Sequence, residues 1–280
     1  MKVAVTGATG FVGRHVVAAL SREAGVSVVT SSRGGDAGGA DGGVRHVPLD
    51  IAQPSLGDYH ALGRPDVLIH LSWSGLPNYR SLHHFESELP RQHTFLSGLV
   101  RAGLPALVCT GTCFEYGMQS GALDETMRPD PQNPYGFAKD ALRRQLAFLR
   151  DSTPFRFTWA RLFYMYGEGQ SAQSLYPLLA SAAERGERVF RMSGGEQLRD
   201  YLPVSEMASM LVGLALRAPD AGIVNVCSGR PVAVRSLVEG WIRQNNWNLA
   251  LELGHYPYPD YEPMAFWGCR EKLTRALNLS

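Results

Sequence analysis

A tyrosine and a lysine placed four residues apart could carry out proton transfer in this chain. Tyr135 and Lys139 lie in the segment NPYGFAKD, where Pro134 opens a predicted helix. Because positions i and i+4 share one face of a helix, the ammonium could stabilise the phenolate and bring the pKa of Tyr135 toward neutrality. A phenol tuned in this way can donate or accept a proton. Chance produces the same spacing in many helices, so its meaning depends on the rest of the chain.

A glycine-rich turn near the N-terminus accompanies the pair. The segment VAVTGATGFVGRH places Gly7, Gly10 and Gly13 between a predicted strand and a predicted helix. Gly7 permits a tight turn, Gly10 lets the backbone approach a pyrophosphate, and Gly13 allows close packing of helix and strand. The helix N-terminus, with Phe11 and Val12, would present free N–H groups to the phosphates. We therefore predict a dinucleotide site, with an ordinary glycine-rich turn as the alternative.

The end of the second predicted strand indicates which dinucleotide binds. An NAD site usually offers Asp or Glu about 20 residues after the glycine turn. This chain instead has VVTSSRGG, in which Ser31, Ser32 and Arg33 could hydrogen-bond a 2′-phosphate. The pattern favours NADP over NAD as the cofactor. The alternative is that Arg33 is a solvated loop residue, or that it stacks on adenine with either cofactor.

Residues after the third and fourth predicted strands complete the expected cofactor site. Asp50, followed by Ile51, ends the third strand, where its carboxylate could accept from the adenine amino group. A helix N-cap is the competing role for Asp50. Leu71 and Ser72 follow the fourth strand at the same edge of the sheet, where open α/β proteins bind ligands.

Six apolar runs of strand length alternate with helical patterns in the first part of the chain: KVAVT, VSVVT, VRHVPL, DVLIHL, PALVCT and FRFTWARLF. Strands without polar alternation are buried on both faces, which predicts an α/β fold of the Rossmann type, a doubly wound parallel sheet with helices on both faces. Pro90 could interrupt the helical segment 81–103. In the helix that carries Tyr135, a stripe must pack against another element, and its members are Ala138, Ala141, Leu142, Gln145, Leu146 and Leu149.

The regular alternation loosens after residue 166. Helical patterns at 174–187, 206–217 and 234–245 are separated by loops rich in Gly and Pro. We expect residues 1–166 to form a dinucleotide-binding Rossmann domain. Residues 167–280 would form a smaller, largely helical substrate-binding lobe, with parts of the chain crossing back to the main sheet. The segment RGGDAGGADGG, at 33–43, is expected to be a flexible surface loop.

Composition narrows the partners. The 280 residues carry 27 basic and 26 acidic side chains, so a net charge of +1 supplies no broad field for nucleic acid or an anionic membrane. No run approaches the roughly 18 apolar residues of a membrane span, and the chain starts directly with a strand, so we expect a cytoplasmic protein. Neither the four cysteines nor the eight histidines, His83 and His84 included, have the spacing of metal ligands. We expect reduced thiols, no metal, and histidines in ordinary surface or packing roles.

Six segments together resemble the extended short-chain dehydrogenase/reductases that act on nucleotide sugars: TGATGFVG, DVLIHLS, TGTCFEYG, NPYGFAK, RLFYMYG and QLRDYLPVSEMA. The match runs from residue 2 to about residue 272. The resemblance implies that Thr112 hydrogen-bonds the reacting oxygen beside Tyr135 and that Lys139 also holds the nicotinamide ribose. It further implies a homodimer formed through two long helices.

Departures from the family pattern narrow the reaction. Cys113 and Phe114 stand where 4,6-dehydratases of this family have an acidic pair, which argues against dehydration. Phe114 also occupies the position of the acid-base Cys in C3/C5-epimerising members. The resemblance then leaves NAD(P)-dependent reduction at C4 of a 4-keto-6-deoxysugar, with dTDP as the expected nucleotide, or 4-epimerisation. A regulator that binds NADP without turnover is a third alternative.

Four further positions are expected to contact the substrate. Trp73, after HLS, replaces a small residue and would narrow the pocket beside the nicotinamide. Tyr164, in RLFYMYG, replaces an Asn that often touches substrate, although it could simply be core. Arg199, with Gln197 nearby in QLRDY, matches a residue that contacts the nucleotide or diphosphate, although it could pair with Asp200. The aromatic segment YPYPDYEPMAFWG could close over a base or deoxysugar, or pack the small lobe.

Overall fold

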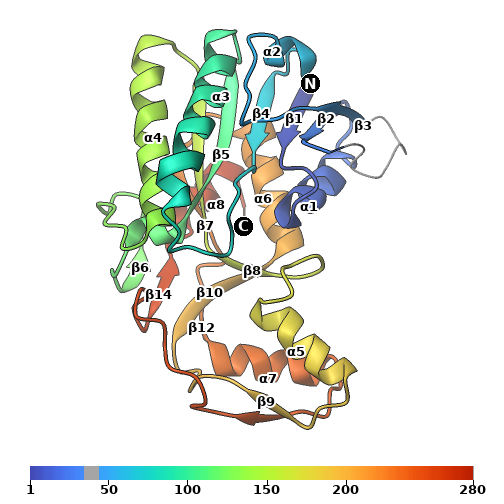
Figure 1. The fold of residues 1–280 in the computed structure, drawn as a ribbon, viewed down its shortest axis with the longest axis vertical. Coiled ribbons are helices and arrows are strands. Elements are labelled where there is room, and N and C mark those ends of the chain that lie inside the picture. Colours follow the sequence, from blue (N-terminus) through green and yellow to red (C-terminus); the bar gives the residue numbers. More distant parts are fainter. Residues whose placement is uncertain (35–43, 280) are drawn as a thin grey trace.

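A parallel β-sheet forms the middle layer of the larger body of the molecule (Figure 1). The computed structural model describes residues 1–34 and 44–279, and within them this sheet has seven strands in the order β11-β7-β5-β4-β1-β2-β3. All of its neighbouring strands pair in parallel. The strands are β1 (Lys2–Thr6), β2 (Ser27–Ser32), β3 (Val44–Pro48), β4 (Val67–His70), β5 (Ala106–Thr112), β7 (Arg156–Leu162) and β11 (Gly222–Val226).

The six predicted apolar runs are confirmed as strands of this sheet, and the predicted fold class is confirmed with them. Their side chains alternate between two apolar faces. Val5 and Ile69 belong to one buried cluster, whereas Ala4 and Leu68, the residues before them, belong to another. Because both faces are covered, both sets of side chains leave water, and each fully buried Val, Leu or Ile stabilises the fold by about 1.5–3 kcal/mol.

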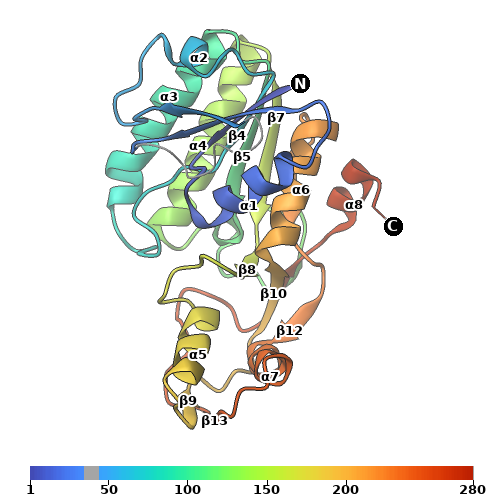
Figure 2. The same ribbon diagram turned by 90° about the vertical axis from the view of Figure 1, so that its right-hand side faces the viewer.

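Helices cover both faces of the sheet, as Figure 2 shows in side view. On one face lie α1 (Phe11–Leu20), α6 (Val204–Arg217) and α8 (Glu271–Leu277). On the other lie α3 (Leu89–Arg101) and α4 (Pro134–Ser152). Shorter segments are α2 (Asp58–Ala61), the π-helical turn η1 (His84–Glu88) and the 3-10 turn η2 (Cys113–Tyr116). The layers place the carboxyl ends of the strands along one open edge, which carries the residues discussed below.

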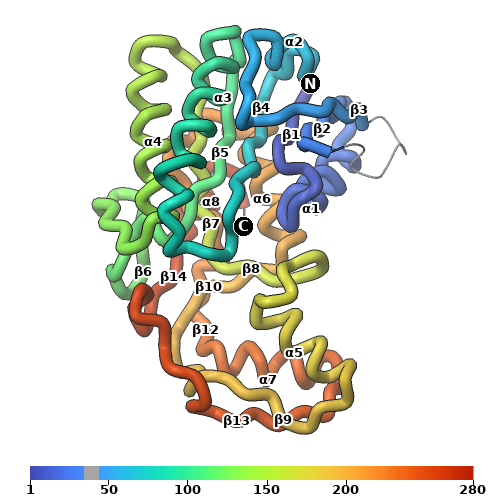
Figure 3. Tube along the Cα trace, viewed as in Figure 1, coloured from blue at the N-terminus to red at the C-terminus, as the bar shows by residue number. Residues whose placement is uncertain are grey.

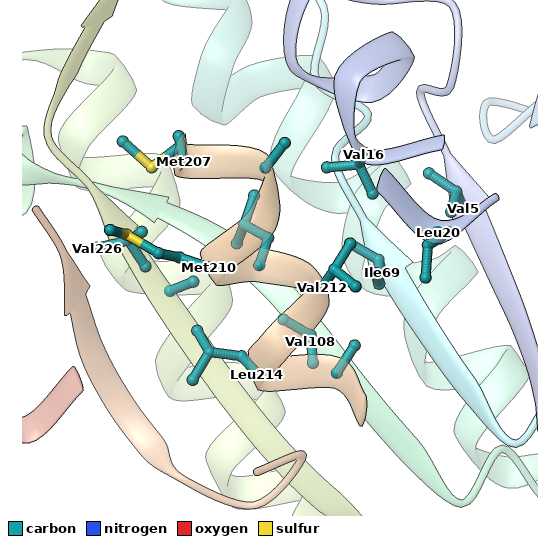
Figure 4. Close-up of a cluster of buried hydrophobic side chains, with 14 of the residues drawn as sticks. Val5, Val16, Leu20, Ile69, Val108, Met207, Met210, Val212, Leu214 and Val226 are labelled. Atoms are coloured by element: carbon teal, nitrogen blue, oxygen red, sulfur yellow. The ribbon is translucent and has the colours of Figure 1, made fainter. Parts of the chain in front are cut away.

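The position of α6 differs from the prediction, which grouped segment 206–217 with the small lobe. In the structure α6 packs on the main sheet beside α1, and Figure 4 shows Met207, Met210, Val212 and Leu214 among side chains of the strands and α1. An apolar helix fits either body equally well from its own pattern. The helix lies here because the chain runs on from it to β11, the edge strand of the main sheet, and α8 later packs on the same face. Together α6 and α8 cover the part of this sheet face that α1 leaves open.

Two local expectations about the long helices have different outcomes. In α4, Ala138, Leu142, Leu146 and Leu149 are buried, but Gln145 is exposed, so the predicted stripe is one residue too wide. Pro90 does not break the helical segment. It lies in the first turn of α3, directly after η1, and the helical path continues through it.

The smaller lobe, which lies below the main sheet in Figure 1, contains strands as well as helices. Its helices are α5 (Leu175–Glu184) and α7 (Val234–Gln244). Its short strands are β8 (Tyr164–Tyr166), β9 (Val189–Arg191), β10 (Leu198–Pro203), β12 (Pro231–Ala233) and β13 (Ala250–Glu252), while β6 (Gly121–Leu123) pairs with β14 (Phe266–Gly268). A cluster around Phe190, Val238 and Trp241 forms its core.

The chain passes between the two bodies several times, as the tube in Figure 3 shows. It leaves the main sheet through β8, returns through β10 to α6 and β11, and returns again through β14 to α8. Because the chain crosses between the two bodies in this way, the domain boundary at residue 166 stays a prediction. Most of the predicted flexible loop, residues 35–43, lies outside the described residues. Among the described residues, no helix combines the length and the apolar character needed to cross a bilayer.

Candidate active site

Four strand ends of the main sheet surround a cavity of about 410 Å³. The glycine turn after β1, Leu71 after β4, Thr112 at the end of β5 and Leu162 at the end of β7 all line it. This main cavity also contains Tyr135 and Lys139. A second cavity of about 330 Å³ lies next to it, since Gly7, Gly10, Leu71 and Trp73 line both.

Tyr135 and Lys139 meet Thr112 because α4 starts against the end of β5. Asn133 caps the helix, with its Oδ1 accepting from the N–H of Gly136 at 2.8 Å. The Lys139 Nζ lies 5.9 Å from the centre of the Tyr135 ring and donates to the Thr110 carbonyl oxygen at 2.9 Å. The structure thus brings together the three residues predicted to be catalytic, while their roles stay predictions.

The pKa of Tyr135 departs from the expectation of the sequence analysis. The phenol is buried, and burial raises its pKa instead of lowering it toward neutrality. Tyr79 and Glu115 act in the same direction, whereas hydrogen bonding with Thr112 opposes the rise. The expected lowering of this pKa by the ammonium is not found, because desolvation, which penalises the charged phenolate, is the largest effect. At neutral pH the Tyr135 side chain is therefore a protonated phenol.

Lys139 is fully buried, and burial lowers the pKa of its ammonium. The carboxylates of Glu115 and Glu88 raise this pKa through their charge. The ring of Trp73 also stabilises the cation, since the Nζ lies 4.0 Å from its centre. Trp73 therefore lies beside the lysine and lines both cavities, while its narrowing of the pocket stays a prediction.

Glu115 holds the backbone of Thr112 in place, and the sequence analysis missed it. Its Oε1 accepts from the Thr112 N–H and from Trp159 Nε1, each at 2.9 Å. Its Oε2 accepts from Arg161 Nε at 2.7 Å, and both partners of this ion pair are fully buried. Thr112 and Glu115 form a capping box at η2. The spacing Thr-x-x-Glu was a signal that could have identified the pair.

Two side chains of η1 hold the loop that carries Trp73. The Trp73 Nε1 donates to His84 Nδ1 at 3.1 Å. One turn further, Glu88 accepts from the Ser74 N–H at 3.1 Å and from the Ser74 hydroxyl at 2.6 Å. His84 is therefore buried and accepts a hydrogen bond from Trp73, which lines the cavities. The sequence analysis gave it only an ordinary surface or packing role. A π-helical turn is frequently found at functional sites.

A buried hydrogen-bonded chain continues from Glu88 to β1. Gln92 Nε2 donates to Glu88 Oε1 at 2.7 Å, and Gln92 Oε1 lies 2.7 Å from His70 Nε2. Because an amide oxygen can only accept, His70 Nε2 carries the hydrogen and Nδ1 accepts from the Thr6 hydroxyl at 2.8 Å. Burial, assisted by the charge of Lys139, lowers the pKa of His70 from 6.5 to about 3. The ring is neutral.

Every residue predicted to bind the cofactor lines one of the two cavities. Phe11, Val12 and Gly13 line the main cavity, and Ser31, Ser32, Arg33, Asp50, Ile51 and Ser72 line the second. Asp50 caps its own turn, since its Oδ1 accepts from the Ala52 N–H at 3.0 Å, and no helix begins there. The proposed N-cap role for Asp50 is therefore wrong.

The glycine turn fits a dinucleotide by its shape. Gly7 has a φ of +71°, and a Cβ on it would lie 2.8 Å from the Ser72 backbone nitrogen. A Cβ on Gly13 would lie 2.1 Å from the Gly7 carbonyl oxygen, so α1 can approach β1 only with glycine there. With these close contacts, backbone N–H groups at the start of α1 face the space shared by the two cavities.

A third cavity of about 320 Å³ contains the other predicted substrate residues, Gln197, Arg199 and Tyr164. Arg199 pairs with Glu262 at 2.9 Å, so the alternative partner Asp200 is wrong. Tyr164 donates to the other oxygen of Glu262 at 2.6 Å. Tyr164 also lines the main cavity, so it joins the two spaces and is not simply core. Sequence reasoning missed Glu262, because no local pattern marks it.

Comparison with known proteins gives a family match and full-length relatives. The model of the NAD dependent epimerase/dehydratase family matches residues 3–227. The dTDP-6-deoxy-L-talose 4-dehydrogenase (NAD(+)) of Aggregatibacter actinomycetemcomitans is 28% identical over 96% of this chain and 100% of its own length. The UDP-glucose 4-epimerase of Azospirillum brasilense is 28% identical over 85% of this chain and 75% of its own. The structure of MoeE5 in complex with UDP-glucuronic acid and NAD has a TM-score of 0.83 and 26% identity, covering 99% of this chain and 93% of that one.

Replacing Glu115 with Gln should lower the free energy of unfolding by about 3–5 kcal/mol, because the buried charge of Arg161 loses its partner. Urea unfolding measures this change. As a matched control, Glu239→Gln removes a half-exposed pair with Arg235 and should change stability by about 1 kcal/mol or less. Equal effects of the two substitutions would contradict the role given to Glu115.

Acid should destabilise the protein through His70. Its folded pKa of about 3 lies below the ordinary 6.5, so the unfolded chain binds more protons in that window and stability falls as the pH drops. Between about pH 7.5 and about pH 4.5 this one group accounts for a loss of about 2–3 kcal/mol. Urea unfolding of His70→Asn should show a smaller acid loss than the wild type. The exposed His255→Asn should keep the full loss, and an unchanged slope in His70→Asn would refute the assignment.

Proposed function

This chain belongs to the NAD dependent epimerase/dehydratase family, and on that premise we propose that it reduces a nucleotide-linked 4-keto-6-deoxysugar at C4. The product would be the 4-hydroxy sugar, and the nucleotide dTDP. The protein is an NAD(P)-dependent oxidoreductase of nucleotide sugars, as its relatives are. One observation carries the choice of reduction: Tyr135 is a buried, protonated phenol beside Thr112 and Lys139, ready to donate a proton.

The cofactor would occupy the two joined cavities. The start of α1 would face the pyrophosphate, and Asp50 and Ile51 would lie beside the adenine. We propose NADP as the preferred form, because Ser31, Ser32 and Arg33 line the adenosine side of the second cavity. The bound nicotinamide supplies the hydride for the reaction.

The residues of the main cavity would supply the remaining chemistry. The Tyr135 hydroxyl donates its proton to the C4 oxygen of the sugar, and the Thr112 hydroxyl hydrogen-bonds the same oxygen. The phenolate that this leaves is stabilised by the Lys139 ammonium, which Thr110 and Trp73 hold in place. Hydride and proton together convert the carbonyl to a secondary alcohol.

The main cavity offers little for competing reactions of the family. Among the described residues that line it, none is Asp, Glu or His. Cys113 is buried and its pKa is raised, so its thiol is a poor acid-base group at neutral pH, and Phe114 has no ionisable group. Proton abstraction from a sugar carbon next to C4 therefore lacks a base, which supports simple reduction over elimination or C3/C5-epimerisation.

The nucleotide half of the substrate would lie in the third cavity. It adjoins the main cavity through Tyr164, and Tyr256, Pro257 and Pro259 line it together with Gln197 and Arg199. A dTDP-linked sugar is supported by the relative of similar length, whose own substrate is a dTDP-6-deoxysugar. A homodimer also remains a proposal, supported by the exposed Phe137 and Phe148 of α4, whose side chains are 53% and 74% accessible.

A 4-epimerase is the second candidate, because a relative of that activity is equally similar over most of the chain. The fate of the cofactor during the reaction distinguishes a reductase from a 4-epimerase. A reductase should consume NADPH or NADH in stoichiometric amounts with a dTDP-4-keto-6-deoxysugar, followed by absorbance at the nicotinamide band. An epimerase should retain its cofactor and interconvert 4-hydroxy sugars with no net absorbance change. Absence of turnover across dTDP-, GDP-, CDP- and UDP-linked sugars, with tight NADP binding, would instead favour a non-catalytic regulator.

Replacing Tyr135 with Phe should lower kcat by roughly 100- to 10,000-fold, because the ring remains but the proton donor is lost. The affinity for the cofactor, measured by fluorescence titration, should change little. Tyr59→Phe removes a hydroxyl on α2, from a residue that lines none of the three cavities, and should leave kcat unchanged. Near-normal turnover of Tyr135→Phe would rule out this residue as the donor.

A further inference from the structure

Gln170 has a buried oxygen without a partner in the wall of the main cavity. It lies in the loop between β8 and α5, and its Nε2 donates to the Met165 carbonyl oxygen at 3.0 Å. Its Oε1 is buried and accepts no hydrogen bond from the described part of the chain. A buried amide oxygen left without a donor costs about 1–3 kcal/mol. Such an atom in a ligand cavity points to a donor that the ligand supplies.

The loop that carries Gln170 is fastened to α1, the helix that opens the dinucleotide site. His15 Nε2 donates to the Glu168 carbonyl oxygen at 2.9 Å. Gly169, with a φ of +83°, lies so close to α1 that a Cβ on it would be 2.6 Å from an Arg14 guanidinium nitrogen. Figure 1 shows this loop, just after β8, next to α1. The start of α1 lines the same cavity as Gln170.

The chemistry of the free atom limits what it can bind. The Nε2 is held by the Met165 carbonyl oxygen, so the Oε1 is the free atom of the amide, and only an N–H or O–H group can satisfy it. In the main cavity the ligands of the proposed reaction offer two such groups: sugar hydroxyls and the carboxamide NH₂ of the nicotinamide. The carboxamide fits better, because the loop is anchored on the dinucleotide helix and the residues proposed to act on the sugar come from β5 and α4.

We propose that Gln170 Oε1 accepts a hydrogen bond from the carboxamide NH₂ of the bound nicotinamide. Gln170 is then a binding residue that fixes the rotation of the nicotinamide ring, and with it the ring face turned toward Tyr135 and Thr112. This assignment rests on NAD(P) binding by the family and is independent of which sugar is reduced. It adds a contact at the reactive end of the cofactor, opposite the end bound by Ser31, Ser32 and Arg33.

The test compares a dinucleotide with its 3-acetylpyridine analogue, in which a methyl group replaces the carboxamide NH₂ and the carbonyl remains. Affinities are measured by calorimetry without sugar, using NADP or NAD, whichever the wild type binds more tightly. The wild type should bind the normal cofactor roughly tenfold more tightly than the analogue. Gln170→Met, similar in length but without the acceptor, should bind the normal cofactor about tenfold more weakly and show no preference between the two.

Two controls separate this contact from a structural role. The fragment of the cofactor that lacks nicotinamide should bind the wild type and Gln170→Met equally, which also shows that the variant is folded. Gln170→Glu gives up the Nε2 hydrogen bond to the Met165 carbonyl oxygen but keeps an acceptor at the same length, so it should bind the cofactor more weakly than the wild type and still prefer the carboxamide over the analogue. The proposal is overturned if Gln170→Met retains the preference, or if the wild type has none. It is equally overturned if Gln170→Met and Gln170→Glu both lose affinity for the nicotinamide-free fragment, since Gln170 would then support the fold.

The same measurements stay informative if the proposed reduction is wrong. They need no sugar and no turnover, so an epimerase or a non-catalytic binder would give the same cofactor result. Conversely, a failed carboxamide test with intact C4 reduction would refute only the role of Gln170. If Gln170 instead binds the sugar, Gln170→Met should raise the KM for the sugar while leaving both cofactor affinities unchanged.

Discussion

The charged amine of Lys139 must be kept inside the protein next to a phenol, and much of the surrounding structure serves that requirement. An isolated ammonium is costly to bury. Here the Thr110 carbonyl oxygen accepts from it at 2.9 Å, the Trp73 ring lies 4.0 Å away, and the carboxylates of Glu115 and Glu88 act on it through their charge. These groups come from β5, from the loop after β4, from η2 and from η1. The ammonium therefore depends on the relative position of four separate segments.

Burial shifts the pKa of the Tyr135 phenol in the opposite direction from the pKa of the Lys139 ammonium. It raises the pKa of Tyr135 and so keeps the proton available, while the adjacent positive charge favours the phenolate once that proton has left. The combination suits a group that donates a proton to a developing alkoxide. The same desolvation raises the pKa of the Cys113 thiol and suppresses its acid-base chemistry. One physical effect thus supports the proposed donor and disfavours a competing one.

The third cavity holds an arginine whose charge is already paired. Arg199 lies in the third cavity, but Glu262 neutralises it and Tyr164 donates to the same carboxylate. A diphosphate would meet this arginine as part of a paired network instead of as a free cation. If the nucleotide binds in this cavity, as proposed, its recognition relies more on the surrounding aromatic and amide groups, such as Tyr201 and Gln197.

Local pattern alone was sufficient for the strands of the first half, the glycine turn and the helix that pairs Tyr135 with Lys139, because apolar period, turn residues and i, i+4 spacing act over a few residues. It was insufficient for the layer occupied by α6 and for the partners of Trp73, Arg199 and Glu115. His84, Glu262 and Arg161 reach these side chains only after distant strands and loops come together. The direction of the Tyr135 pKa shift belongs with them, because desolvation depends on how many groups from all parts of the chain surround an atom. The sequence by itself determined which chemical groups were present and which elements carried them, and only the tertiary structure decided which of them lost water and which found a charge.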